Sequence, residues 1–253
     1  MIYGLTPLHA ARKILSKLAK IEINALLQTG IEVLEQKSDG SYLIRLGRHT
    51  LQTKSETALV PGKEYWVDME QTKEGSVRLS RLHPKPLLLK KEGFWIFGKE
   101  LLSELSKESD PAEAVKEKFM QMMASSQSRE SFQSLTQMLI SLQHGVVTLP
   151  VEDRGRRMLL QMRKKKRENE TLKEKSVEFY AAFNNLGPVE GAIVRYGEKK
   201  DLKLEVFYPK TARLLESLKE DLPGFSNISV SLSSQTIAPF WESDSLGLLD
   251  IRG

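Results

Sequence analysis

The residue types that most often carry out catalysis are thinly spread along this chain. Its four histidines have no partner three or four residues away and no surrounding carboxylates at the spacing of metal ligands; they are His9, His49, His83 and His144. There are no cysteines, which excludes disulfides, thiolate nucleophiles and zinc–thiolate sites. The glycine-rich nucleotide-binding, P-loop, nucleophile-elbow and zinc-protease motifs are also missing from the sequence. We therefore expect a protein that is not an enzyme, with no catalytic residue, no cofactor and no metal.

The strongest charge feature is a basic stretch near the middle of the chain. It contains Arg154, Arg156 and Arg157, and then the uninterrupted run Arg163, Lys164, Lys165, Lys166 and Arg167. Such a stripe could neutralise phosphates, but no aromatic residue that would stack on bases lies between residues 151 and 178. We interpret the run as an exposed strand end and turn. The alternative is a binding patch for an acidic protein surface or for RNA.

Residues 23–86 have the pattern of short β-strands. Tyr42, Ile44 and Leu46 alternate with the residues between them, and Asp-Gly, Pro-Gly and Glu-Gly pairs break the pattern. About five short strands in this length favour a small closed antiparallel β-barrel. If the barrel bound nucleic acid, Tyr42, Arg45, Arg48 and His49 would lie near the binding face. Nucleic-acid binding through the barrel and the basic run is our alternative function.

Helical patterns occupy two other regions. Residues 1–22 predict a basic amphipathic helix that packs on the next domain, with a membrane surface or an organelle address as the alternative. Residues 87–144 predict a helical linker or arm, and Asp110-Pro111 is a helix-start signal within it. These middle helices form either a mobile arm or a layer packed on a neighbouring domain. No apolar run approaches the ~18 residues that a membrane span requires.

Residues 145–235 return to strands and then add one helix. We predict an antiparallel sheet covered by an amphipathic helix with Leu214, Leu215, Leu218 and Leu222 facing inward, so the fold class is α+β. A last strand is expected to turn Ile228, Val230 and Leu232 inward. The tail, residues 236–253, has no periodicity and is expected to be loose, unless Phe240 and Trp241 dock it.

The stretch "LGPVEGAIVRYGEKKDLKLEVFYPKTARLLESLKEDLPGFSNISVSL" resembles the C-terminal domain of bacterial flagellar hook-length control proteins. The pattern consists of the Leu186-Gly187 step, a strand, a turn, a second strand ending at Phe207, a leucine-rich helix and a closing strand. The upstream stretch "VVTLPVEDRGRRMLLQMRKK" is similar to the strand pair that often precedes that domain. "HTLQTKSETALVPGKEYWVDME" resembles the small β-domain of short family members.

The resemblance implies a non-enzymatic regulator of flagellar type III export and hook assembly. Its expected partners are the export-gate protein and hook or hook-cap subunits, and it would be cytoplasmic or exported through the flagellar apparatus. The stretch available as a spacer, residues 99–143, would span only ~70 Å as a helix, so a role in the substrate switch is favoured over measurement of hook length. The candidate partner-binding residues are Leu186, Gly187, Arg195, Phe207, Arg163, Lys164, Lys165 and Lys166.

Overall fold

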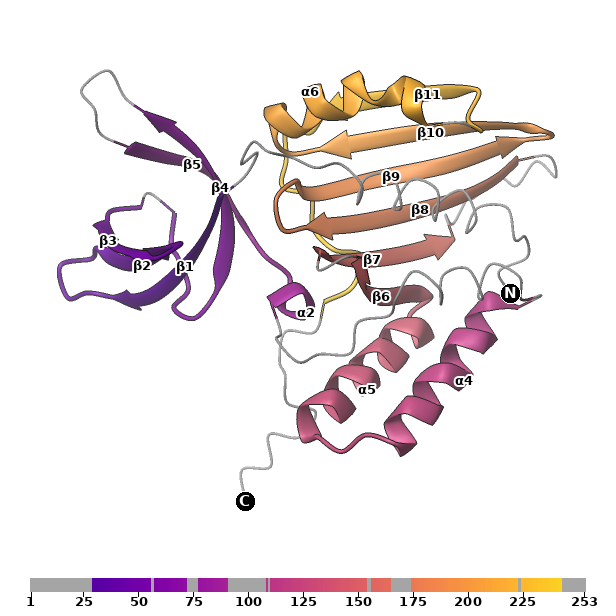
Figure 1. The fold of residues 1–253 in the computed structure, drawn as a ribbon, viewed down its shortest axis with the longest axis horizontal. Helices are drawn as coiled ribbons and strands as arrows, with labels where there is room; N and C mark the ends of the chain where they lie inside the picture. The colour runs from indigo at the N-terminus through magenta and orange to yellow at the C-terminus, as the bar shows by residue number, and fades with distance from the viewer. Residues whose placement is uncertain are drawn as a thin grey trace.

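The computed structural model describes residues 29–55, 57–71, 77–90, 108, 110–153, 156–164, 174–222 and 224–242. These residues form two β-sheets and several helices, which confirms the α+β class (Figure 1). The expected helices at residues 1–22 and just after Lys99, and the basic residues Lys165 and Lys166, lie outside the described residues. Among the described helices, none is long and apolar enough to cross a membrane.

The first sheet is open, so the expectation of a closed barrel is wrong. Its strands are β1 (Thr29–Gln36), β2 (Tyr42–Leu46), β3 (His49–Thr53), β4 (Glu64–Gln71) and β5 (Val77–Pro84). They pair antiparallel in the order β3-β2-β1-β4-β5, which leaves β3 and β5 as the two edges. β3 has only five residues, and the first four are exposed. It therefore has no row of buried side chains against which β5 could pack to close a barrel.

The second sheet is mixed, where an antiparallel sheet was expected. Its strands are β6 (Val146–Asp153), β7 (Arg156–Lys164), β8 (Glu174–Phe183), β9 (Gly187–Tyr196), β10 (Lys199–Val206) and β11 (Asn227–Leu232). All neighbours are antiparallel except β10 and β11, which are parallel. The helix α6 (Pro209–Ser217) and the short η1 (Lys219–Asp221) carry the chain back along the sheet, and such a crossover produces a parallel pair.

Between the sheets in sequence, the described residues form three further helices: α2 (Leu87–Lys90), α4 (Pro111–Ala124) and α5 (Arg129–Gln143). Asp110 begins α4 as predicted, because its carboxylate accepts hydrogen bonds from the Ala112 and Glu113 backbone. Phe119, Leu135 and Met138 share one core with the second sheet, so α4 and α5 pack on it. The C-terminal unit thus has the one helix expected, α6, and α4 and α5 pack on the same sheet, which is one of the two arrangements left open for the middle helices.

The second sheet is the central layer of the molecule. Side chains on its helix-covered face, such as Phe179 and Leu204, belong to the main core with Leu215 of α6. On the opposite face, Leu159, Tyr180 and Ala182 are covered by Trp66 of β4, Leu89 of α2 and Ile237 of the tail. At the β11 edge, Ile228 and Val230 are half-buried, but Leu232 was wrongly expected to face inward. It is 48% exposed, because it ends an edge strand.

Candidate functional site

The Leu186-Gly187 step lies inside the molecule, at the turn between β8 and β9. Leu186 is 3% exposed, and its carbonyl accepts a hydrogen bond of 2.8 Å from the Thr211 hydroxyl. Gly187 has φ +77°, and a Cβ at this position would lie 2.6 Å from a ring carbon of Tyr208. Only glycine fits both the backbone conformation and the close approach of the ring. The step therefore has a structural role, and its contact with a partner protein stays a prediction.

Phe207, at the end of β10, lies in a cluster of rings. Its ring centroid is 5.1 Å from that of Tyr208 and 5.6 Å from that of His83, in edge-to-face geometry. The Arg81 guanidinium lies 5.9 Å from the Phe207 ring centroid, and Arg81 Nη1 donates to the Phe207 carbonyl at 3.2 Å. Phe207 is half-buried, so much of its surface is already used within the chain.

These residues belong to a joint between the two sheets, which we define as Trp66, Asp68, Arg81, His83, Phe207, Tyr208 and Lys210. Trp66 is fully buried, and its Nε1 donates to the carbonyls of Phe183 and Asn184, both at 3.0 Å. Tyr208 donates from its hydroxyl to the Arg81 carbonyl at 2.9 Å. Lys210 Nζ lies 3.4 Å from the Asp68 carboxylate, which is buried. Each contact joins the first sheet to the second, so the joint holds the two sheets in a fixed arrangement.

Within the joint, Arg81 has an unusual backbone conformation. It has φ +52°, a conformation that non-glycine residues rarely adopt. Its carbonyl is held by the Tyr208 hydroxyl and its side chain by the Phe207 carbonyl and ring. A strained residue persists where surrounding contacts determine its conformation, and the second sheet supplies those contacts here.

The charged candidate residues lie away from this joint. Arg163 forms a 2.8 Å ion pair with Glu178 on the neighbouring strand, and its guanidinium lies 3.9 Å from the Phe240 ring centroid. Lys164 is exposed at the end of β7. Arg195 is near the other end of β9 from Gly187, and its Nε donates to the Gly197 carbonyl at 2.7 Å. The structure thus brings Leu186, Gly187 and Phe207 together and leaves Arg163, Lys164 and Arg195 at separate places.

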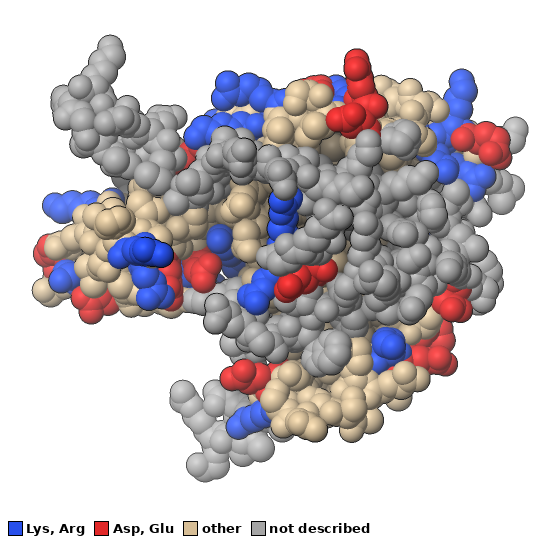
Figure 2. Space-filling model, in the orientation of Figure 1, with Lys and Arg blue, Asp and Glu red and all other residues tan. Residues whose placement is uncertain are grey.

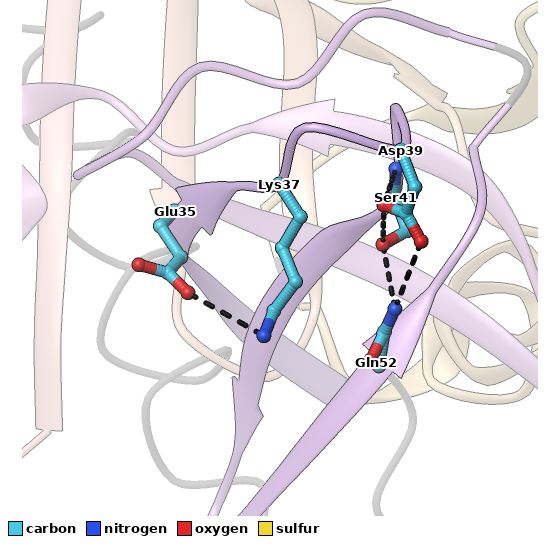
Figure 3. Close-up of polar contacts among 5 residues, drawn as sticks. All are labelled: Glu35, Lys37, Asp39, Ser41 and Gln52. Carbon is cyan, nitrogen blue, oxygen red and sulfur yellow. Dashed lines mark hydrogen bonds and ion pairs between the residues drawn. The ribbon is translucent and has the colours of Figure 1, made fainter.

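The turn between β1 and β2 holds a cluster of polar side chains (Figure 3). Asp39 Oδ1 accepts from the Ser41 amide at 2.9 Å and from its hydroxyl at 2.6 Å, and Gln52 Nε2 donates to Ser41 Oγ at 2.8 Å. Hydrogen bonds from Ser41 lower the pKa of Asp39. Because the carboxylate is used to hold the turn and no histidine is among these partners, Ser41 is not an activated nucleophile. Glu35 and Lys37 form an exposed pair at 3.8 Å beside it.

Metal ligands, cavities and the expected nucleic-acid face can be located among the described residues. No group of three or more metal-ligating side chains occurs among them. A cavity of about 10 Å³ beside Gln161 and Trp241 has room for about one water. Tyr42 is 5% exposed and belongs to the core of the first sheet, and Arg45 pairs with Glu32. Of the residues expected on the nucleic-acid face, His49 is exposed on β3. Figure 2 shows basic and acidic side chains interspersed on the visible face of that sheet.

Among the residues that make the joint, only Phe207 was a candidate from the sequence. The alternating pattern of β4 shows only that Tyr65 and Val67 share one face and that Trp66 and Asp68 share the other. In the structure both faces of β4 are buried. Gln161 carried a signal that could have been used, because it is the one polar residue within the apolar centre of β7, Met158–Met162.

Comparison with known proteins gives no match to any family model, curated protein or solved structure. The function is therefore argued from the residues of this chain and from the pattern that they form.

Proposed function

We propose that this chain is a non-enzymatic regulator of flagellar type III export and hook assembly, acting through protein–protein contacts. The observation that carries the proposal is the unit β9–β10–α6–β11, whose order of strand, turn, strand, leucine-rich helix and strand is the pattern on which the resemblance to hook-length control proteins rests. Leu215 of α6 packs with Leu204 and Val206 of β10 in a solid core. Such a unit offers a partner protein a defined surface and the main-chain groups of its edge strand β11.

A role in the switch of export substrate is favoured over measurement of hook length. A protein that measures hook length needs a segment that can extend between two ends of the molecule. Here α4 and α5 are packed on the second sheet through Phe119, Leu135 and Met138, so the middle of the chain is part of the folded body. We therefore propose contact with the export gate, and with hook or hook-cap subunits, during the change of export substrate. The proposed location is the cytoplasm, with export through the flagellar apparatus as the alternative.

Exposed apolar side chains on the second sheet are the first candidates for such contacts. Tyr196, at the end of β9, is 49% exposed, and Leu232, at the end of β11, is 48% exposed. Aromatic and large aliphatic residues are the usual anchors of protein interfaces. Lys203, exposed on the neighbouring strand β10, provides a matched position for a control substitution.

The test has a cellular and a biochemical part. Deletion of the gene in the source bacterium should change the distribution of hook lengths or delay the appearance of filament, measured by electron microscopy of isolated hooks. The purified chain should bind the cytoplasmic domain of the export-gate protein in a calorimetric titration. Tyr196→Ser and Leu232→Ser should each weaken binding at least ~10-fold, whereas Lys203→Ser should leave it unchanged. Unchanged hooks together with no binding would refute the proposal.

A further inference from the structure

The tail segment, residues 237–242, lies on the second sheet although it has no helix or strand of its own. Its main chain is held by two buried side chains of the body. Gln161 Nε2 donates to the Trp241 carbonyl at 2.6 Å, and Gln161 Oε1 accepts from the Trp241 amide at 3.2 Å. A nitrogen of the His83 ring lies 2.8 Å from the Ile237 carbonyl. The body therefore recognises this segment partly through backbone groups that any residue type would supply.

The buried polar groups are unusual for simple packing of a chain end. Gln161 is 1% exposed and His83 is 3% exposed. A buried amide has a substantial desolvation cost unless it is hydrogen-bonded, and an apolar side chain would cover the sheet without that cost. The side-chain amide of Gln161 both donates to and accepts from the backbone of Trp241, as the backbone groups of paired β-strands do. Such main-chain contacts are typical of sites that bind extended peptides.

Three side chains of the tail segment supply specificity. Ile237 is 4% exposed and packs in the cluster that contains Trp66 and Leu89. Phe240 lies beneath the Arg163 guanidinium, 3.9 Å from it, with Tyr180 on another side at 6.4 Å between ring centroids. Glu242 accepts from the Leu87 amide at 3.1 Å.

The contacts therefore select an aliphatic residue, an aromatic residue three positions later and an acidic residue two positions after that. The Tyr180 hydroxyl is also buried here without a hydrogen-bond partner in the described part of the chain, so it could accept or donate to a different occupant.

We propose that this surface is a binding site for an extended segment of a partner protein that has this pattern, and that the tail segment occupies it within the chain until the partner displaces it. We name it the tail site, made of Gln161, His83, Arg163, Tyr180, Leu87 and Leu89. The proposal does not depend on the flagellar assignment. A covalently attached occupant competes at an effective concentration in the millimolar range, so a free peptide binds well only when the tail segment is released.

The test uses the full chain and a fluorescein-labelled peptide with the sequence of residues 234–242. In the receiver variant, Ile237→Ser and Phe240→Ser remove the side-chain anchors of the tail and leave the tail site unchanged. Thr236→Ser with Ala238→Ser is the matched control, because both residues are exposed and the tail should remain bound. Fluorescence anisotropy should show at least ~10-fold tighter binding to the receiver than to the unaltered chain or the control. Gln161→Leu in the receiver should weaken binding at least ~10-fold.

Three results would overturn the proposal. The first is equal peptide binding by the folded receiver and the unaltered chain. The second is peptide binding to the receiver that is not weakened by Gln161→Leu. Equally strong binding of a peptide that has serine in place of Ile237 and Phe240 would count in the same way. The third is a dimer of the unaltered chain in analytical ultracentrifugation that the receiver substitutions abolish, because the occupant would then be a second copy. Circular dichroism checks folding, and if the double variant unfolds, Phe240→Ser alone serves as the receiver because it keeps the Ile237 contacts.

Discussion

The two sheets of this protein differ in how far each can stabilise itself. Among the described side chains, the first sheet has seven buried hydrophobic residues in its own core, whereas the core of the second sheet and its helices has 21. Small cores provide little net stability, because the entropy cost of ordering the chain is nearly as large as the gain from burial. The first sheet also places Trp66 in a third cluster that the second sheet shares. We infer that the second sheet is a self-sufficient unit and that the first depends on the joint.

The strongest way to break this relation is to remove Trp66. Trp66→Ala should destabilise the first sheet by about 3–5 kcal/mol, because it leaves a cavity in the joint and two carbonyls without their donor. Hydrogen exchange followed by mass spectrometry should show loss of protection in β1–β5 while β8–β10 remain protected. Trp66→Phe keeps most of the ring and should cost less. Equal loss of protection in both sheets would contradict the proposed dependence.

A second, smaller effect is expected at Gly187, where the second sheet meets the joint. Gly187→Ala forces an L-residue into positive φ and puts its Cβ 2.6 Å from the Tyr208 ring. The two costs together should reduce the free energy of unfolding by about 2–4 kcal/mol. Gly197→Ala is the matched control, because Gly197 also has positive φ, +59°, but no atom lies within 4 Å of the added Cβ. Urea unfolding should therefore show about 1–2 kcal/mol for the control. Equal costs would mean that Tyr208 moves aside freely.

A third substitution tests one hydrogen bond across the joint. Tyr208→Phe removes the donor to the Arg81 carbonyl, which lies 2.9 Å away, and leaves the ring in place. We expect a loss of about 1 kcal/mol, the usual net worth of such a bond. Because the bond connects the sheets, hydrogen exchange should quicken near Arg81 in β5 and stay unchanged within β8 and β9. Faster exchange within β8 would instead show that the phenol supports the second sheet itself.

The sequence predicted local elements well because their causes are local. The return to strands expected over residues 145–235 is confirmed in β8, where Phe179, Ala181 and Phe183 lie on one face. Asp110-Pro111 predicted the start of α4, because capping depends on residues within one turn of the helix. The helix after Pro209 was predicted from the spacing of its leucines, which is also a local pattern.

The errors concern partners that are distant along the chain. Alternation in β4 shows that Tyr65 and Val67 share a face, but it cannot show that Trp66 will meet Phe183, 117 residues later. Likewise, a strand–helix–strand order is compatible with either direction of the last strand, and the crossover of α6 made β11 parallel to β10. The candidate residues Leu186, Gly187 and Phe207 lie close to Tyr208, and Phe207 contacts Arg81 and His83 of the chain's own first sheet.

The smallest effect that we predict is a dependence of the joint on pH. Burial lowers the pKa of His83, and the carbonyls of Pro84 and Ile237 and the carboxylate of Glu242 offset this in part. In the unfolded chain the imidazole has its ordinary pKa of about 6.5, so below that pH the unfolded state binds more protons than the folded state. Stability should therefore fall as pH decreases through 6.5 toward the folded pKa. His83→Gln should remove this part of the pH dependence between pH 8 and 5.5, measured by urea unfolding, whereas His49→Gln on the exposed strand β3 should retain it. A His83→Gln profile that runs parallel to the unaltered chain would show that protonation of His83 is not coupled to the joint.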